Sequence, residues 1–212
     1  MKRMIGLAML AMTSVALLSS CTKDPLNNLS EEESRIYITN RNNSADFGTY
    51  KTYSIPDSVH VISNNSFQGG QATTWDLQAL AAVRNALESR GYVRVSRSQS
   101  PDLGINVSRL YNTTTNLVDM QSYWGGYGGY YDPYYWGYSG YGYGYPSYYT
   151  LVESTEALVS VEMLDLKNAS ANRTINVIWN GVIRGSGVFN SNAITPGVQA
   201  LFQQSPYIKT VQ

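Results

Sequence analysis

The sequence predicts an α+β domain, in which a mainly antiparallel sheet has two helices packed on one face and carries a Tyr/Gly-rich insertion loop. Apolar and polar residues alternate in several short segments, as they do in strands with one buried face. Two other segments repeat apolar residues at helical spacing between capping residues. The order strand, helix, strand, insertion, hairpin and helix is typical of an antiparallel sheet with helices on one face. The other face is then either solvated or covered by the insertion.

The best-defined element is a helix over residues 73–90. Thr73 or Thr74 is the expected N-cap, and Asp76 lies in the first turn. Gly91 follows where a left-handed C-terminal cap is needed, and Tyr92 is placed to cover the last apolar turn. The stripe that faces the sheet is expected to contain Leu77, Leu80, Val83 and Leu87.

The other elements are predicted by the same patterns. A strand is expected over residues 47–55, followed by a polar loop, a short edge strand at 93–95 and a strand with one buried face at 103–107. Residues 157–164 and 175–183 predict a hairpin joined by a polar turn. Thr195 is the expected N-cap of the last helix, with Pro196 at its first position and Ser205 near its end.

Residues 1–20 resemble a lipoprotein signal peptide. Lys2 and Arg3 precede an apolar run that is too short to span a membrane. The run ends in LSSC at residues 18–21, the order in which a cysteine is acylated before cleavage. We therefore expect cleavage between Ser20 and Cys21 and palmitate-type acyl chains on Cys21, which together attach the protein firmly to a membrane.

The expected mature chain consists of a tether over residues 21–35 and a single domain over residues 36–212. Thr22 stands where an aspartate often marks retention at the inner membrane, so we expect the outer membrane, with the leaflet left open. Losing Lys2 and Arg3 leaves 13 basic residues of the original 15 against 15 acidic ones, a net charge of about −2. This balance gives no basic patch for nucleic acid, so the membrane and an envelope protein or glycan are the expected partners.

Residues 121–149 hold 12 of the 18 tyrosines and eight glycines. Ordering such a segment costs roughly 1–2 kcal/mol per residue in backbone entropy, which favours a flexible insertion. Its rings could stack on sugars, form a protein interface or mediate self-association, and composition does not choose among these. The candidate contact residues are Trp124, Tyr127, Tyr130, Tyr131, Tyr134, Tyr135 and Trp136.

The inventory of reactive side chains argues against most catalytic classes. His60 is the only histidine, expected at the surface, and the only cysteine is the lipidation site, so no metal site and no cofactor are expected. A hydrolase with paired carboxylates stays open because it needs only two acids in a cleft. Its candidates, each expected to be a solvated surface charge, are Asp102, Asp119, Asp132, Glu153, Glu156 and Glu162.

Several short motifs, taken in order, resemble the lipoprotein family of the domain-of-unknown-function type, DUF4136. They are DFGTYKTY at residues 46–53, the helix end RGY at 90–92, PDLGINV at 101–107, the Gly/Tyr-rich insertion, IWNGV at 178–182 and SPY at 205–207. The resemblance implies an envelope lipoprotein with an α+β domain and no assigned catalytic residues. The chain departs from the family pattern in extra residues at 168–174 and in its heavily aromatic insertion.

These observations favour a non-catalytic lipoprotein of the outer membrane that serves as a structural or binding module, with the aromatic insertion as its contact. The alternative is a hydrolase that acts on glycan or peptidoglycan through paired carboxylates. If the insertion is flexible, deleting residues 121–149 leaves the domain folded.

Overall fold

The computed structural model describes residues 29–64, 66–111, 118–119, 133–140, 142–144, 149–150 and 157–211. The strands are β1 (Ile36–Arg41), β2 (Thr52–Ser54), β3 (Val59–Ser63), β4 (Ser66–Gln71), β5 (Val93–Arg94), β6 (Leu103–Tyr111), β7 (Val118–Asp119), β8 (Gly142–Gly144), β9 (Tyr149–Thr150), β10 (Leu158–Asp165) and β11 (Thr174–Arg184). The α-helices are α2 (Thr74–Glu88), α4 (Ala169–Asn172) and α5 (Ser191–Gln203), and the 3-10 helices are η2 (Phe47–Thr49), η3 (Arg97–Gln99) and η5 (Pro133–Trp136). In these ranges no helix is long and apolar enough to cross a membrane.

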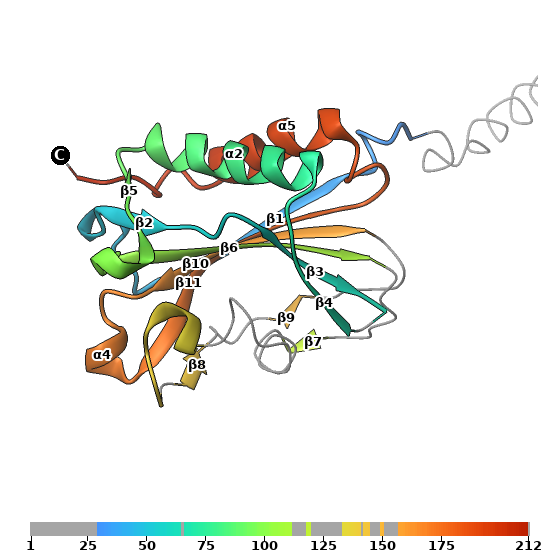
Figure 1. Ribbon diagram of the computed structural model, residues 1–212. Coiled ribbons are helices and arrows are strands. Elements are labelled where there is room, and N and C mark those ends of the chain that lie inside the picture. Colours follow the sequence, from blue (N-terminus) through green and yellow to red (C-terminus); the bar gives the residue numbers. More distant parts are fainter. Residues whose placement is uncertain are drawn as a thin grey trace, which may run out of the picture.

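A mixed sheet forms the centre of the domain, with strand order β1-β11-β10-β6-β2-β5 (Figure 1). Its longest ladders, β1 with β11, β11 with β10 and β10 with β6, are antiparallel. The shorter β2 and β3 pair in parallel with the two ends of β6. The predicted α+β class and the hairpin of β10 and β11 are therefore confirmed.

Helices α2 and α5 lie side by side on one face of the sheet (Figure 1). The larger hydrophobic core lies between these two helices and the sheet, and it contains Tyr53, Leu80, Val161, Trp179 and Leu201. The indole Nε1 of Trp179 donates to the Ser205 hydroxyl at 2.9 Å, which ties the end of α5 to the middle of β11. The two-helix layer on one face is as predicted.

The capping chemistry of α2 follows the sequence closely. The Thr73 hydroxyl accepts from the amide of Asp76, and the Asp76 carboxylate accepts from the amide of Thr73 at 2.9 Å, which completes a capping box. At the other end Gly91 has φ +89°, and the amide of Tyr92 donates to the Leu87 carbonyl at 3.3 Å. The predicted position of Leu77 in the buried stripe is wrong, because Leu77 is 49% exposed. The neighbouring Asp76 is fully buried instead.

The first predicted strand and the last predicted helix differ from the structure. Only Thr52–Ser54 of residues 47–55 forms a strand. Asp46 accepts from the Gly48 amide and caps η2, so Phe47–Thr49 form a 3-10 helix before the strand begins. Helix α5 begins at Ser191, not after Thr195, so Pro196 lies inside it. The turn of residues 187–190 places Asn190 as the N-cap. The sequence predicts a later start because Pro196 favours the first position of a helix.

The second face of the sheet is also buried, which is one of the two alternatives that the sequence leaves open for it. Every residue of β10 is buried, including Glu162, and His60 on β3 has no exposed surface. Residues 57–72, expected as a polar loop, contain the antiparallel hairpin of β3 and β4, and the His60 ring stacks on Phe67 at 4.0 Å. The surface positions predicted for His60 and Glu162 are therefore wrong.

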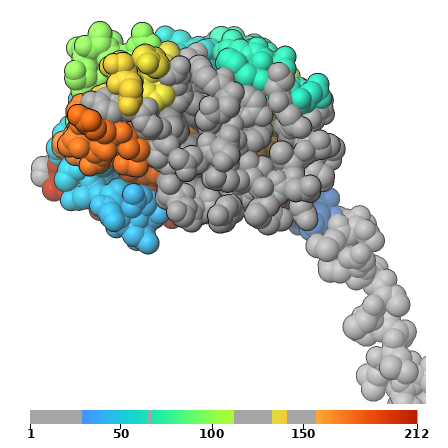
Figure 2. Space-filling view, turned by 90° about the horizontal axis from the view of Figure 1, so that it is seen from below, coloured from blue at the N-terminus to red at the C-terminus, as the bar shows by residue number. Residues whose placement is uncertain are grey.

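Part of the Tyr/Gly-rich insertion packs on this second face. Trp136 of η5 is 5% exposed and joins Leu164, Leu166, Ile175 and others in a second hydrophobic cluster. Figure 2 shows residues 133–140 between the segment that carries η3 and α4, and β8 pairs in parallel with the start of β11. Residues 133–140 and 142–144 thus have defined positions, which corrects the expectation that the whole insertion is a flexible loop.

The last residues of the expected tether contact the domain. Residues 30–34 form a turn in which the Glu33 carboxylate accepts from the amide and hydroxyl of Ser30. The Glu31 carboxylate accepts from the side-chain amide of Asn190 at 2.7 Å, and Arg35 donates to the Ser186 carbonyl at 3.3 Å. The last residues of the expected tether are therefore bound to the loop that precedes α5.

Candidate functional site

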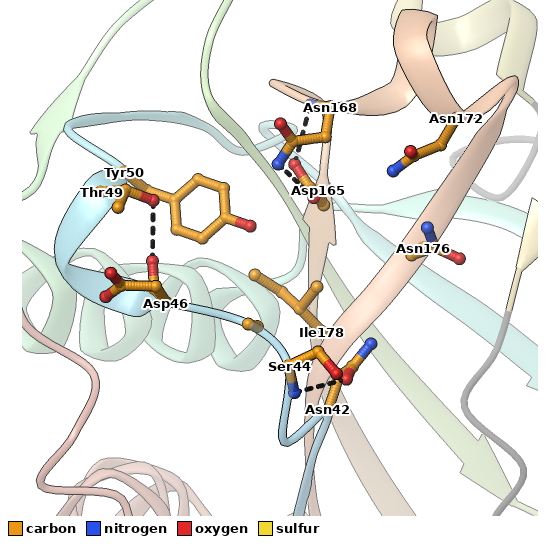
Figure 3. A pocket seen from close by; sticks show the side chains of 11 residues that line it. Asn42, Ser44, Asp46, Thr49, Tyr50, Asp165, Asn168, Asn172, Asn176 and Ile178 are labelled. Carbon is orange, nitrogen blue, oxygen red and sulfur yellow. Dashed lines mark hydrogen bonds between the residues drawn. The ribbon is translucent and has the colours of Figure 1, made fainter.

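The candidate site is a polar pocket beside α4 where two segments distant in the sequence, residues 42–50 and 165–178, meet (Figure 3). One wall consists of η2 and the loop that follows β1. The other wall consists of α4, the last residue of β10 and the first part of β11. Figure 2 shows α4 next to the segment that carries η2. The pocket has a volume of about 310 Å³, and it is lined by Asn42, Ser44, Ala45, Asp46, Thr49, Tyr50, Asp165, Asn168, Asn172, Asn176 and Ile178.

A β-bulge in β11 shapes the floor of this pocket. Met163 of β10 pairs with Trp179 and Leu164 pairs with Val177, so Ile178 has no partner opposite it. The extra residue puts Ile178 and Trp179 together on the helix-covered side, where both belong to the larger core. Asn176, two residues before the bulge, then lines the pocket beside Ile178.

Tyr50 and Asp165 are the buried polar groups of the site, at 3% and 6% exposure. Asp165 accepts from the backbone amide of Asn168 at 3.0 Å and from its side-chain amide at 2.8 Å. Burial, followed by the nearby negative charge of Asp165, raises the pKa of Tyr50 above its ordinary value. The phenol therefore stays protonated and can donate, while the carboxylate is held as an acceptor.

Asparagine side chains dominate the rim. Asn42 accepts from the Ser44 amide at 2.9 Å and so stabilises the loop after β1. Asn172 of α4 and Asn176 of β11 lie across the pocket from Tyr50 (Figure 3), and within the described residues neither side-chain amide makes a hydrogen bond. Each amide offers both a donor and an acceptor to a ligand.

A second hollow lies between the two long helices and is a weaker candidate. It measures about 490 Å³ and is lined mainly by small and amide side chains of α2 and α5, such as Ala82, Asn85 and Gln199. Arg90 also lines this hollow, and its guanidinium donates to the Ala86 carbonyl at 3.0 Å and lies 5.0 Å from the centre of the Phe202 ring. These contacts already satisfy the charged group, and no buried carboxylate or phenol lies in the lining.

The structure places three of the predicted contact residues. Tyr134 is 68% exposed, Tyr135 is partly buried with the Arg97 guanidinium 4.4 Å from its ring, and Trp136 is a core residue. Trp136 is therefore no surface contact, because its indole fills the space above Gly104. The predicted contacts Trp124, Tyr127, Tyr130 and Tyr131, and the lipidation site with Ser20 and Cys21, lie outside the described residues.

The structure does not bring the predicted carboxylates together where it describes them. Asp102 accepts from the amides of Lys51 and Thr52 at 2.7 and 3.1 Å, a structural cap. Glu162 pairs across the sheet with Asn106, four residues from Asp102, which is about 13 Å along the strand at ~3.3 Å per residue. Asp119 is described only as part of β7, and Asp132, Glu153 and Glu156 lie outside the described residues.

No group of three or more metal-ligating side chains of the His, Cys, Asp and Glu types occurs in the described part of the chain. The asparagine pocket itself escaped prediction because its walls are far apart in the sequence. The one signal is the asparagine content of residues 168–176. The sequence predicts a polar turn over residues 167–173 there, and the structure places α4 in it.

The chain is similar to proteins of known structure. A DUF4136 family protein from Bacteroides thetaiotaomicron superimposes with a TM-score of 0.69 at 30% identity, over 83% of this chain and 98% of that one. The PelC dodecamer from Paraburkholderia phytofirmans gives a TM-score of 0.40 at 12% identity, over 84% of this chain and 99% of that one. No curated protein matches the chain.

The residues that carry the family resemblance serve packing and capping in this structure. Asp46 caps η2, the Phe47 ring lies 5.2 Å from that of Tyr207, and Asp102 caps the start of β2. The family model "Domain of unknown function (DUF4136)" matches residues 38–207, nearly the whole described domain. The chain belongs to the DUF4136 family.

Proposed function

We propose that this protein is a lipid-anchored, non-catalytic binding module of the cell envelope, held at the outer membrane through Cys21. The observation that carries the binding role is the pocket of Figure 3, in which buried Tyr50 and Asp165 face open asparagine side chains. Small-molecule sites commonly combine such a concave shape with a few convergent polar groups. The anchor rests on the LSSC motif at residues 18–21.

The hydrogen bonds of the pocket favour binding over hydrolysis. A glycosidase needs one carboxyl group as a proton donor and a second as nucleophile or base. Both oxygens of Asp165 accept from Asn168, and one oxygen of Asp46 accepts from the Gly48 amide at 3.1 Å. These carboxylates are thus placed as acceptors that orient their neighbours.

Fractionation of the native bacterium tests the anchor. Wild-type protein is expected in the membrane pellet after a high-salt wash, and Cys21→Ser in the soluble fraction, because the variant cannot be acylated. Ser20→Ala is the matched control, since a small residue still precedes the cysteine, and it should pellet like the wild type. A Cys21→Ser protein that pellets equally well, or an unmodified thiol found by mass spectrometry on the native protein, refutes the anchor.

An assay for released fragments tests the absence of catalysis. Purified wild-type protein in detergent is incubated with peptidoglycan and with neutral oligosaccharides, and soluble products are followed by chromatography. We expect no products above those of a sample without protein. Turnover that disappears in Asp165→Asn contradicts the non-catalytic role.

A further inference from the structure

We infer that the asparagine pocket binds a neutral, hydroxyl-rich ligand, namely a saccharide unit of one or two rings. The inference rests on the proposed binding function and names the class of ligand. Three features of the pocket carry it: the charge of the lining, the hydrogen-bonding capacity of its side chains, and its size with an apolar strip on the floor.

The charge of the lining excludes acidic ligands. Asp46 and Asp165 are its only ionisable groups besides Tyr50, and none of the described residues that line the pocket is basic. Lys167 is a nearby cation, but its ammonium donates to the Thr49 carbonyl at 2.7 Å and lies 5.8 Å from the Tyr50 ring centre. A phosphate or carboxylate ligand would therefore meet two negative charges without a counter-ion in the pocket.

The hydrogen-bonding groups match hydroxyls. A sugar hydroxyl donates one hydrogen bond and accepts others, so it pairs best with groups that can do both. The amides of Asn172 and Asn176 can do both, and no hydrogen bond within the described residues engages them. Tyr50 adds a phenol kept neutral by burial, and Asp165 adds an acceptor that Asn168 holds in place.

The size and the floor match one or two rings. A volume of about 310 Å³ lies at the small end of the roughly 300–1,000 Å³ typical of ligand pockets. Ala45 is partly exposed and, with the 2% of Ile178 that is exposed, provides a small apolar surface in an otherwise polar lining, where the C–H groups of a sugar ring can pack. A larger apolar ligand would leave the surrounding amides and carboxylates without hydrogen bonds, which is costly.

The test is titration of the full-length wild-type protein in detergent with a panel of probes, followed by calorimetry. The neutral probes are glucose, galactose, mannose, N-acetylglucosamine and their disaccharides. The charged probes are glucuronate, glucose 6-phosphate, inorganic phosphate and calcium chloride. We expect at least one neutral saccharide to bind, and its acidic counterpart to bind at least tenfold more weakly.

The double variant Asn172→Ala, Asn176→Ala should weaken that binding about tenfold or more, because it removes two ligand hydrogen bonds. Asn192→Ala is the matched control, an exposed asparagine of α5 outside the pocket, and should stay within about twofold of the wild type. Tyr50→Phe serves as a second pocket variant that removes one hydroxyl and keeps the ring. Circular dichroism checks that each variant is folded.

Binding of no neutral saccharide overturns the inference, as does binding that both pocket variants leave unchanged, equal binding of the acidic probes, or binding of calcium alone. The proposed function fails separately. Hydrolysis of a bound saccharide would refute the non-catalytic role and leave the ligand class correct. Pocket-dependent binding of an envelope component that is not a saccharide would keep the binding role and overturn the ligand class.

Discussion

Trp136→Ala is expected to destabilise the domain strongly, although the residue lies in the Tyr/Gly-rich insertion. Trp136 is 5% exposed and packs with Leu166 and Ile175 on the second face of the sheet. A buried indole removes roughly 150–250 Å² from water, which at about 25 cal/mol per Å² gives about 4–6 kcal/mol as an upper bound. Measured truncations of buried aromatic residues cost about 3–5 kcal/mol, so we expect about 3–4 kcal/mol.

Urea unfolding followed by far-ultraviolet circular dichroism measures this change, with the slope of the transition checked for constancy. Tyr134→Ala is the control from the same short helix, because Tyr134 is 68% exposed. Its cost should stay below about 1 kcal/mol. A loss below about 1 kcal/mol for Trp136→Ala would refute the packed position of the insertion.

Gly104 allows a sharper test of the same contact. A Cβ atom added at Gly104 would lie 3.1 Å from Cε2 and Cη2 of Trp136 and from the Leu166 side chain. Gly104→Ala should therefore cost about 1–3 kcal/mol by overpacking. In the Trp136→Ala background the ring is absent and the cost should fall by at least about 1 kcal/mol, whereas strict additivity would show that the two residues do not touch.

Three further perturbations probe the rest of the domain. Arg109→Ala should cost about 3–5 kcal/mol in urea unfolding, because it leaves the fully buried Asp76 carboxylate, 2.8 Å from Arg109, uncompensated; a loss below about 1 kcal/mol contradicts this. Leu80→Ala should cost about 2–5 kcal/mol and Leu77→Ala less than about 1 kcal/mol, because Leu80 is buried and Leu77 is not; equal losses would mean that α2 is rotated. Burial lowers the pKa of His60 from 6.5 to about 4, so as the pH falls the unfolded chain takes up the proton first. The His60 contribution is complete above pH 6.5 and is lost as the pH falls through 4, up to about 3 kcal/mol. His60→Gln should remove that part of the pH dependence in urea unfolding, and an unchanged slope would contradict the burial of the ring.

Local chemistry in the sequence was sufficient to predict α2. Thr73 and Asp76 cap each other across one turn, and Gly91 is required where φ is +89°. These signals work because all their partners lie within a few residues, so no tertiary contact has to be known. The hairpin of β10 and β11 was predictable for a similar reason, since a short polar turn joins two apolar segments.

Long-range contacts decide the burial of Glu162 and His60, which the sequence predicts at the surface. The alternation in β10 predicts a surface position for Glu162, but Glu162 is buried because the second face of the sheet is covered as well. His60 lies in a segment that reads as a polar loop, and only the pairing of β3 with β6 makes it a buried strand residue. Which side of a strand meets solvent depends on what is packed there, and alternation alone does not contain that information.

The sequence by itself determined the α+β class, the capped helix α2, the central hairpin and the family resemblance, and it predicts a signal peptide that ends before Cys21. The tertiary structure alone decided that both sheet faces are buried, that Trp136 belongs to a core and that asparagines from distant segments surround Tyr50 and Asp165. The reason is physical. Caps, turns and periodic stripes are interactions between near neighbours, whereas burial and a pocket arise when segments more than a hundred residues apart are packed together.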